Sequence, residues 1–257
     1  MDESRKKEKI KACIAIGIIL IAIIVTGIVS MKYYVEGEKN LPFYLSKITI
    51  VSTAEGVDNK EPETTAENKT NKSENKWDFS IFQNNDVYFS IGKNENTDEL
   101  IESVSIENIK ITKTPEVGNI QIYMPNSVEG RTFSYNDEYI LPEDNLIYRG
   151  GSKSNTKTLE IGNQGGIAVI RFSNVGIGDY ISNEDEEIKH DGSMLAKKGI
   201  NVDNLKFEVN FDLAIKMKNK SYVTNITLNM PCGENLIKEG TTSEEITEGF
   251  IFRRVKI

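Results

Sequence analysis

Cysteine and histidine are almost absent from this chain of 257 residues. The two cysteines are Cys13, inside a long apolar run, and Cys232, so no disulfide can form within the chain beyond that run. Secreted eukaryotic domains of this size are often held together by disulfides, and the heavy use of Asn, Ile and Lys is typical of bacteria. The composition therefore favours a bacterial surface protein.

Positive charge is also scarce outside the N-terminal segment. Residues 1–32 contain six of the 31 Lys and Arg and three of the 39 Asp and Glu, which leaves 25 basic and 36 acidic side chains in the rest. That remainder has a net charge of −11, whereas nucleic acids and anionic lipid surfaces attract clustered Lys and Arg. We therefore predict no nucleic-acid partner and no required cofactor, and leave cationic partners and divalent ions open.

One uninterrupted apolar run, residues 12–31, stands out in an otherwise polar chain. Its 20 residues match the roughly 30 Å hydrocarbon thickness of a bilayer at a rise of about 1.5 Å per residue. Five basic side chains precede it in residues 1–11, so the positive-inside rule predicts a cytoplasmic N-terminal tail. A cleaved signal peptide is the alternative, but its apolar region spans only about 7–15 residues and ends at a small-residue cleavage site. We predict a retained single transmembrane helix.

The chain after the apolar run alternates between apolar and polar residues with a period of two, which indicates half-buried β-strands. These strands are predicted at 41–51, 77–81, 87–91, 104–111 and 120–124. A turn is predicted at 84–86, and a β-bulge where the alternation slips at Glu107-Asn108. The polar segment 55–76 has too few apolar side chains to offset the entropy of ordering and is predicted to be a disordered loop.

The longest alternation runs from Leu205 to Met217, and a second begins at Tyr222 and ends at Met230. With a turn at 219–221 between them, they predict a long antiparallel hairpin. Short helices are predicted only near 97–103 and 193–199.

We predict an all-β extracytoplasmic region made of antiparallel β-sandwich structure, divided into modules at 41–150 and 151–257. The segments Ile120–Pro125 and Ile226–Pro231 resemble one another, and each is followed by similar residues at nearly the same spacing. This favours a duplicated module of about 100 residues, although a shared composition explains the similarity equally well.

The order of three reactive residue types matches that of sortases, membrane-anchored bacterial β-barrel transpeptidases. The residues are His190, Cys232 and Arg253 or Arg254, and Thr227–Cys232 resembles the Thr-Leu-x-Thr-Cys strand of that family. The resemblance implies a thiolate that attacks a sorting-signal amide, a histidine that protonates the leaving amine and an arginine that stabilises the oxyanion.

The sequence departs from the sortase pattern at several points. One extra residue precedes Cys232, proline is its immediate neighbour, and His190 follows an acidic run whose charge would raise the pKa of a nearby thiol. We therefore assign no family and expect a surface histidine and a strand-end cysteine that do not meet.

Other candidate sites are weaker. The acidic loop 183–187 offers oxygen ligands for Ca²⁺ but lacks the alternating ligand spacing of an EF-hand, so a solvated loop is the alternative we favour. The glycine-rich segment 162–166 precedes a strand and has no following Lys-Ser/Thr, which indicates a turn and no phosphate site. Trp77 is expected to anchor the core, with sugar stacking as its alternative.

These observations predict a single-pass membrane protein with a cytoplasmic N-terminus and a binding or assembly role toward a protein or cell-wall partner. No enzymatic activity is expected. A sortase-like transpeptidase is the first alternative, and a signalling or anchoring subunit is the second.

Overall fold

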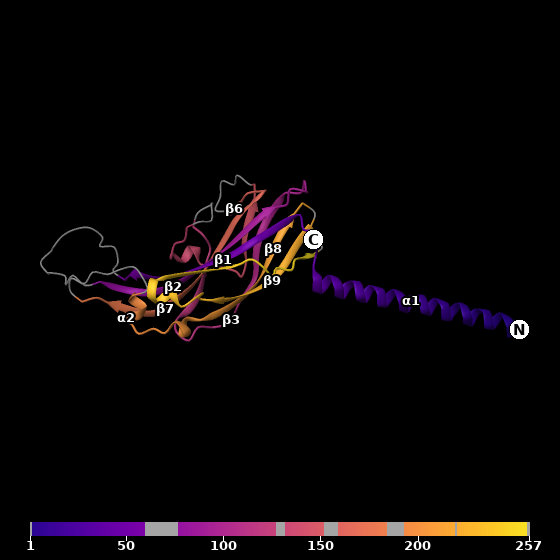
Figure 1. Cartoon of the computed structure of the whole chain (residues 1–257), viewed down its shortest axis with the longest axis horizontal. Helices are drawn as coiled ribbons and strands as arrows, with labels where there is room; N and C mark the ends of the chain where they lie inside the picture. The colour runs from indigo at the N-terminus through magenta and orange to yellow at the C-terminus, as the bar shows by residue number, and fades with distance from the viewer. Residues whose placement is uncertain are drawn as a thin grey trace.

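The computed structural model describes residues 2–59, 77–126, 132–151, 159–183, 193–218 and 220–255. Its strands form two sheets, and one apolar helix extends away from them (Figure 1). In spatial order the first sheet contains β10 (Thr241–Ile246), β1 (Phe43–Asp58), β2 (Asp78–Lys93), β7 (Gly165–Ile181) and β4 (Asn119–Tyr123). The second contains β11 (Arg253–Val255), β9 (Lys220–Met230), β8 (Phe207–Met217), β3 (Ile101–Lys113), β5 (Leu146–Gly150) and β6 (Leu159–Ile161). All pairs are antiparallel except β5 with β6, so the predicted antiparallel sandwich with one N-terminal helix is confirmed.

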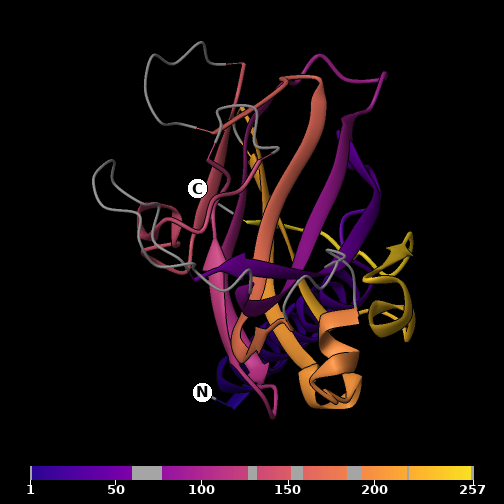
Figure 2. The same ribbon diagram turned by 90° about the vertical axis from the view of Figure 1, so that its left-hand side faces the viewer.

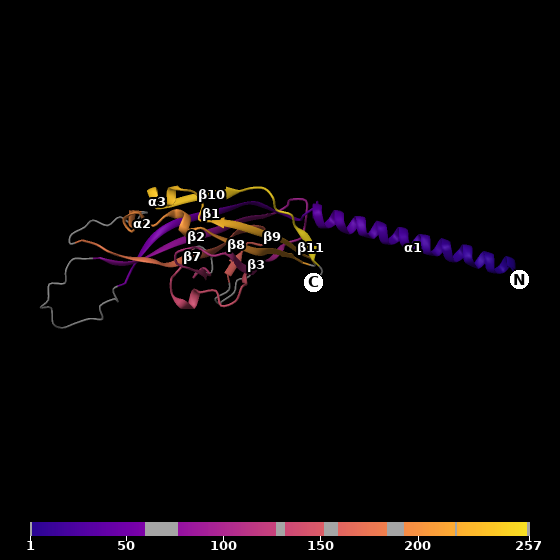
Figure 3. The same cartoon turned by 90° about the horizontal axis from the view of Figure 1, so that it is seen from below.

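The N-terminal helix, α1 (Asp2–Glu36), contains a stretch from Cys13 to Met31 that is long and apolar enough to cross a membrane. None of this stretch is buried against the rest of the chain. The helix ends at Gly37, whose left-handed φ of 71° favours glycine. Figures 1 and 3 show α1 leaving one end of the sandwich, with β11 at that same end.

The two sheets pack face to face over one shared core because their strands alternate inward and outward side chains. On β8 the inward side chains from Phe207 to Met217 are buried. Phe211 meets Phe89 of β2 edge to face, with ring centroids 5.7 Å apart. Both aromatic residues belong to one continuous cluster that draws on both sheets.

The shared core contradicts the predicted division at residue 150. Strands from both sides of that boundary pair directly, since β2 pairs with β7 and β3 pairs with β8. The echoing segments also occupy different places, because β4 lies at the edge of the first sheet and β9 lies within the second. The chain therefore forms one interleaved sandwich in which the strands of each sheet come from both predicted modules.

Three local predictions were wrong. The polar run Asn84-Asn85-Asp86 does not turn, because β2 continues through it and its neighbours bond its side chains. Residues 55–58, which were predicted to belong to a loop, are part of β1, which pairs with β2 as far as Asp58 opposite Phe79. Residues 60–76 lie outside the described residues. No helix forms near 97–103, where β3 begins at Ile101.

Other local predictions are confirmed. The predicted hairpin of β8 and β9 forms, with Phe207 opposite Met230, but β9 begins earlier than expected, because Lys220 and Ser221 of the predicted turn already pair with Met217 and Lys216. The bulge in β3 is present, because its register with β8 shifts after Glu107 and Asn108 adopts a φ of 54°. The short helix α2 (Ser193–Lys197) lies within the predicted range 193–199.

A second, smaller apolar cluster lies at the end of the sandwich opposite α1. It joins Phe79 and Ile81 of β2 to Leu195 of α2, Leu205 of η2 (Val202–Leu205) and Leu236 of α3 (Asn235–Glu239). Figure 2 views the molecule from this end and shows the orange α2 beside the yellow α3. One further 3₁₀ turn, η1 (Asp137–Tyr139), lies in a segment that passes over the first sheet.

Candidate functional site

Cys232, the candidate nucleophile, follows the end of β9 and is buried in the shared core. Its backbone N–H donates to Ser52 Oγ at 3.4 Å. Burial, together with the charge and hydrogen bond of Glu244, raises the pKa of the Cys232 thiol to about 12. A thiol in these surroundings stays protonated at neutral pH, whereas a nucleophilic cysteine needs a lowered pKa.

The candidate arginines lie far from this thiol. Arg253 is opposite Val223 on β9, and Arg254 is opposite Tyr222. Val223 and Met230 are separated by about 23 Å along the strand at ~3.3 Å per residue, which is farther than an arginine side chain can reach. His190 lies outside the described residues. The described part of the chain therefore does not bring Arg253 to Cys232.

The other predicted sites have mixed outcomes. The acidic loop 183–187 lies outside the described residues except for Asn183, so the favoured solvated loop and its Ca²⁺-binding alternative both stay predictions. In the described ranges no group of three or more His, Cys, Asp or Glu could hold a metal ion. The segment 162–166 is a turn, as predicted, in which Gly165 N–H donates to the Gly162 carbonyl. Trp77 is no core anchor, because it is 47% exposed and only its face stacks on Phe79.

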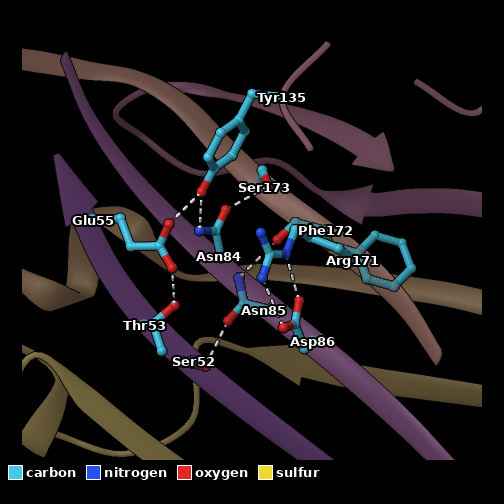
Figure 4. A network of polar contacts seen from close by, with 10 residues as sticks. All are labelled: Ser52, Thr53, Glu55, Asn84, Asn85, Asp86, Tyr135, Arg171, Phe172 and Ser173. Atoms are coloured by element: carbon cyan, nitrogen blue, oxygen red, sulfur yellow. Dashed lines mark hydrogen bonds and ion pairs between the residues drawn. The ribbon is translucent and has the colours of Figure 1, made fainter. Parts of the chain in front are cut away.

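A buried polar network occupies the outer face of the first sheet (Figure 4). The Tyr135 hydroxyl donates to Glu55 Oε2 at 2.6 Å and accepts a hydrogen bond from Asn84 Nδ2 at 2.5 Å. The Ser173 hydroxyl donates to Asn84 Oδ1 at 2.6 Å. Thr53 completes the network with a bond to Glu55, so β1, β2 and β7 are all connected to Tyr135.

An ion pair lies beside this network on the same face. Arg171 of β7 forms a two-pronged bond to Asp86 of β2, with Nε 2.6 Å and Nη2 2.9 Å from the two carboxylate oxygens. The guanidinium carbon lies 4.4 Å from the ring centroid of Phe133. Burial lowers the pKa of Arg171, but the hydrogen bond and charge of Asp86 outweigh burial and raise it overall.

The network holds a segment in place and does not suit proton transfer. Burial and Glu55 raise the pKa of Tyr135 well above its usual range, so neither it nor Arg171 changes charge near neutral pH. Tyr135 also packs edge to face on Phe82 and Tyr123. These contacts fix residues 132–140 against the sheet, and the segment in turn shields the ion pair from water.

In the described part of the chain, an edge strand and an open pocket are two of the regions accessible to a partner. The first is β10, the longest edge strand of the two sheets in the described residues. The second is the end of the sandwich next to α1, which contains an open pocket of about 850 Å³. An aromatic cluster lines this pocket. The ring centroid of Phe43 lies 5.3 Å from that of Tyr222 and 4.9 Å from that of Phe252.

Comparison with known proteins adds no relative. No protein-family model matches the chain, and no curated protein or solved structure is significantly similar to it. The function must therefore be argued from the geometry alone.

The sequence contains one signal for the polar network, in the segment that was predicted to be a turn. Asn84-Asn85-Asp86 interrupts an apolar alternation that resumes in the same phase at Val87, which is the pattern of one strand with buried polar residues. Tyr135 and Arg171, the partners of Asn84 and Asp86, are distant in sequence, and no local pattern identifies them.

Proposed function

We propose that this protein is a single-pass membrane protein of the bacterial cell surface, with its N-terminus in the cytoplasm and its sandwich outside. The observation that supports this proposal is the direct joint between the apolar helix and the sandwich. Glu38 N–H, two residues after α1, donates to the Phe252 carbonyl at 2.8 Å. A signal sequence is removed and needs no such joint to the folded domain, whereas an anchor that positions the domain benefits from one.

We further propose that the sandwich binds a protein or cell-wall partner, and that β10 adds a strand from a protein partner. Edge strands offer unpaired backbone groups to an incoming strand, and most edges here are blunted. β11 and β6 have three residues each. The edge of β4 is partly covered, because Met124 N–H donates to the Tyr139 carbonyl and Leu141 N–H donates to the Ile122 carbonyl. In contrast, β10 has six residues and no strand on its outer side among the described residues.

The register shows which β10 groups face outward. Ala54 N–H donates to the Gly240 carbonyl, and bonded pairs alternate along an antiparallel ladder. Thr242, Glu244 and Ile246 therefore bond to β1, while the N–H groups of Thr241, Ser243 and Glu245 point away from the sheet. The carboxylates of Glu244 and Glu245 already have partners within the sandwich, since Lys47 pairs with Glu245 and the Cys232 thiol bonds to Glu244, so the backbone of this edge is what it offers to an incoming strand.

Anchoring and orientation are tested by labelling single cysteines with a membrane-impermeant maleimide in intact cells. In a Cys13→Ala/Cys232→Ala background, we expect Ser243→Cys to react in intact cells and Ser4→Cys to react only after lysis. The chain should also stay in the membrane pellet after alkaline carbonate washing. Release into the supernatant, or labelling of Ser4→Cys in intact cells, contradicts the proposal.

Strand addition is tested with a photo-crosslinking residue at position 245 and proline at position 243. Ser243→Pro removes an outward N–H and should abolish the crosslinked adduct while the sandwich stays folded. The control is Ser243→Ala, which changes the same side chain but keeps the outward N–H. An adduct that survives Ser243→Pro contradicts strand addition at β10 without affecting the anchoring proposal.

A further inference from the structure

The end of the sandwich next to α1 begins very close to the end of the apolar helix. Gly37 follows Met31 by six residues, which is about 9 Å of helix. A side chain on Gly37 would lie 2.6 Å from Ile251 Cγ2, so Ile251 touches the main chain at this point. The headgroup layer on each side of a bilayer is roughly 5–8 Å thick. Ile251 therefore lies at the level where headgroups meet water if α1 crosses the membrane.

This end of the sandwich also exposes apolar and aromatic side chains that the shared core does not use. Tyr44 is 50% exposed and Ile251 is 41% exposed. The Tyr44 ring covers Gly92 of the neighbouring strand, where a side chain would collide with the phenol. An aromatic ring with a polar tip, held against the sheet in this way, suits the boundary between lipid and water.

The charge at this end differs from the acidity of the sandwich as a whole. The tip of the β8–β9 hairpin carries Lys216, Lys218 and Lys220. Lys220 contacts Glu99 at 3.1 Å and Lys216 contacts Glu102 at 3.4 Å, so the tip is close to neutral rather than strongly basic. Contact with lipid headgroups would thus depend mainly on apolar and aromatic side chains, and less on attraction to anionic lipid.

We infer that this end of the sandwich, with Tyr44 and Ile251, rests in the phospholipid headgroup layer of the membrane that α1 crosses. The inference depends on the proposed anchoring. The occupant follows from the chain length, because about 9 Å of helix leaves no room for a protein layer, and two packed sheets alone need about 10 Å. The pocket above the aromatic cluster of Phe43, Tyr222 and Phe252 then opens toward headgroups.

The single native tryptophan provides an internal control for this inference. Trp77 precedes β2, and Lys93 ends the same strand opposite Phe43, near α1. Trp77 is therefore about 50 Å from the α1 end at ~3.3 Å per residue. A tryptophan placed at residue 44 or 251 reports on the α1 end, while Trp77 reports on the far end of the same molecule.

The test uses the full chain in vesicles of phosphatidylglycerol and phosphatidylethanolamine that contain a phospholipid with a nitroxide on its headgroup. We expect strong fluorescence quenching in Trp77→Phe/Tyr44→Trp and in Trp77→Phe/Ile251→Trp. The unsubstituted protein, which reports through Trp77, should show almost none. Circular dichroism of each variant in vesicles checks that the sandwich is folded, and the second probe position covers the case in which one variant misfolds.

Three outcomes overturn the inference in different ways. If the chain floats with the vesicles and neither probe is quenched more than Trp77, the sandwich stands clear of the bilayer and only this inference fails. If both the nitroxide and an aqueous quencher fail to reach the probes, and this shielding increases with protein concentration, a second copy of the chain covers the surface. If the chain does not float with the vesicles, the anchoring proposal fails as well.

Discussion

Two neighbouring residues of β2, Gln83 and Asn84, are both fully buried but differ in how their amides are satisfied. Asn84 faces outward and bonds to Tyr135 and Ser173. Gln83 faces the interior, and neither polar atom of its amide has a partner in the described part of the chain. On the outer face, Asn84 finds one partner on β7 and one on segment 132–140, which approaches from outside the sheet, whereas no described segment brings a partner to Gln83 on the inner face.

The inner position of Gln83 lies between the two apolar clusters of the molecule. Ser52 and Asn85 bond to each other at 2.6 Å beside the shared core, while Ala54, opposite Gln83, belongs to the smaller cluster. Asn174, also opposite Gln83, has an unpaired side-chain oxygen as well. The outer polar residues therefore stabilise the fold through their partners, while the unpaired amide of Gln83 lowers the free energy of unfolding.

Removing one partner of the outer ion pair should have the largest effect. Asp86→Leu leaves the Arg171 charge buried and unpaired, which we expect to cost about 3–5 kcal/mol of unfolding free energy. The measurement is urea unfolding of the full chain in detergent, followed by circular dichroism. The control, Asp86→Leu/Arg171→Met, removes both charges and should regain most of the loss. If Asp86→Leu loses less unfolding free energy than Asp86→Leu/Arg171→Met, the ion pair does not stabilise the fold.

Removing the Tyr135 hydroxyl should have a smaller effect that is centred on segment 132–140. Tyr135→Phe removes one hydrogen bond from each of Asn84 and Glu55, which we expect to cost about 1–3 kcal/mol of unfolding free energy. Hydrogen exchange should increase first in residues 132–140. The matched control is Tyr139→Phe on the same segment, since the Tyr139 hydroxyl is outside the buried network. Equal effects of the two variants would mean that the network does not hold the segment.

Replacing the unpaired inner amide should be neutral or stabilising. Gln83→Met keeps the length of the side chain and removes two unsatisfied polar groups, which we expect to change the unfolding free energy by between about 0 and +2 kcal/mol. Asn85→Leu, two residues away on the same face, removes a satisfied amide and should be destabilising. The comparison between the two faces fails if Gln83→Met costs as much as Asn85→Leu in the same urea titration.

The same contrast explains which features the sequence could predict. The β8–β9 hairpin and the bulge at Asn108 depend on residues close in sequence, so their alternation was sufficient. The path of β2 depends on Tyr135, whose distance along the chain removes it from any local pattern. The interleaving of the sheets depends on long-range pairs such as β3 with β8, and periodicity does not specify which strands pair. The buried polar network was missed altogether, because its members come from strands that are distant in sequence. Arg253 and Cys232 lie apart in the structure, and His190 lies outside the described residues.

The effect expected to be smallest at neutral pH is the titration of Cys232, which contacts the inner polar residues through its N–H bond to Ser52. Burial and Glu244 raise the pKa of its thiol from 9.0 to about 12, so the unfolded chain loses this proton at a lower pH than the folded one. The contribution of Cys232 to stability is therefore complete below about pH 9 and declines as the pH rises toward 12. In a Cys13→Ala background, Cys232→Ala should give a shallower loss of unfolding free energy between pH 9 and 11.

The same Cys13→Ala protein should react with a thiol reagent at pH 8 only after urea is added, because the thiol is neutral and covered. Rapid labelling of the folded protein would contradict the burial of this side chain, and would make a nucleophilic, sortase-like role of Cys232 the better explanation.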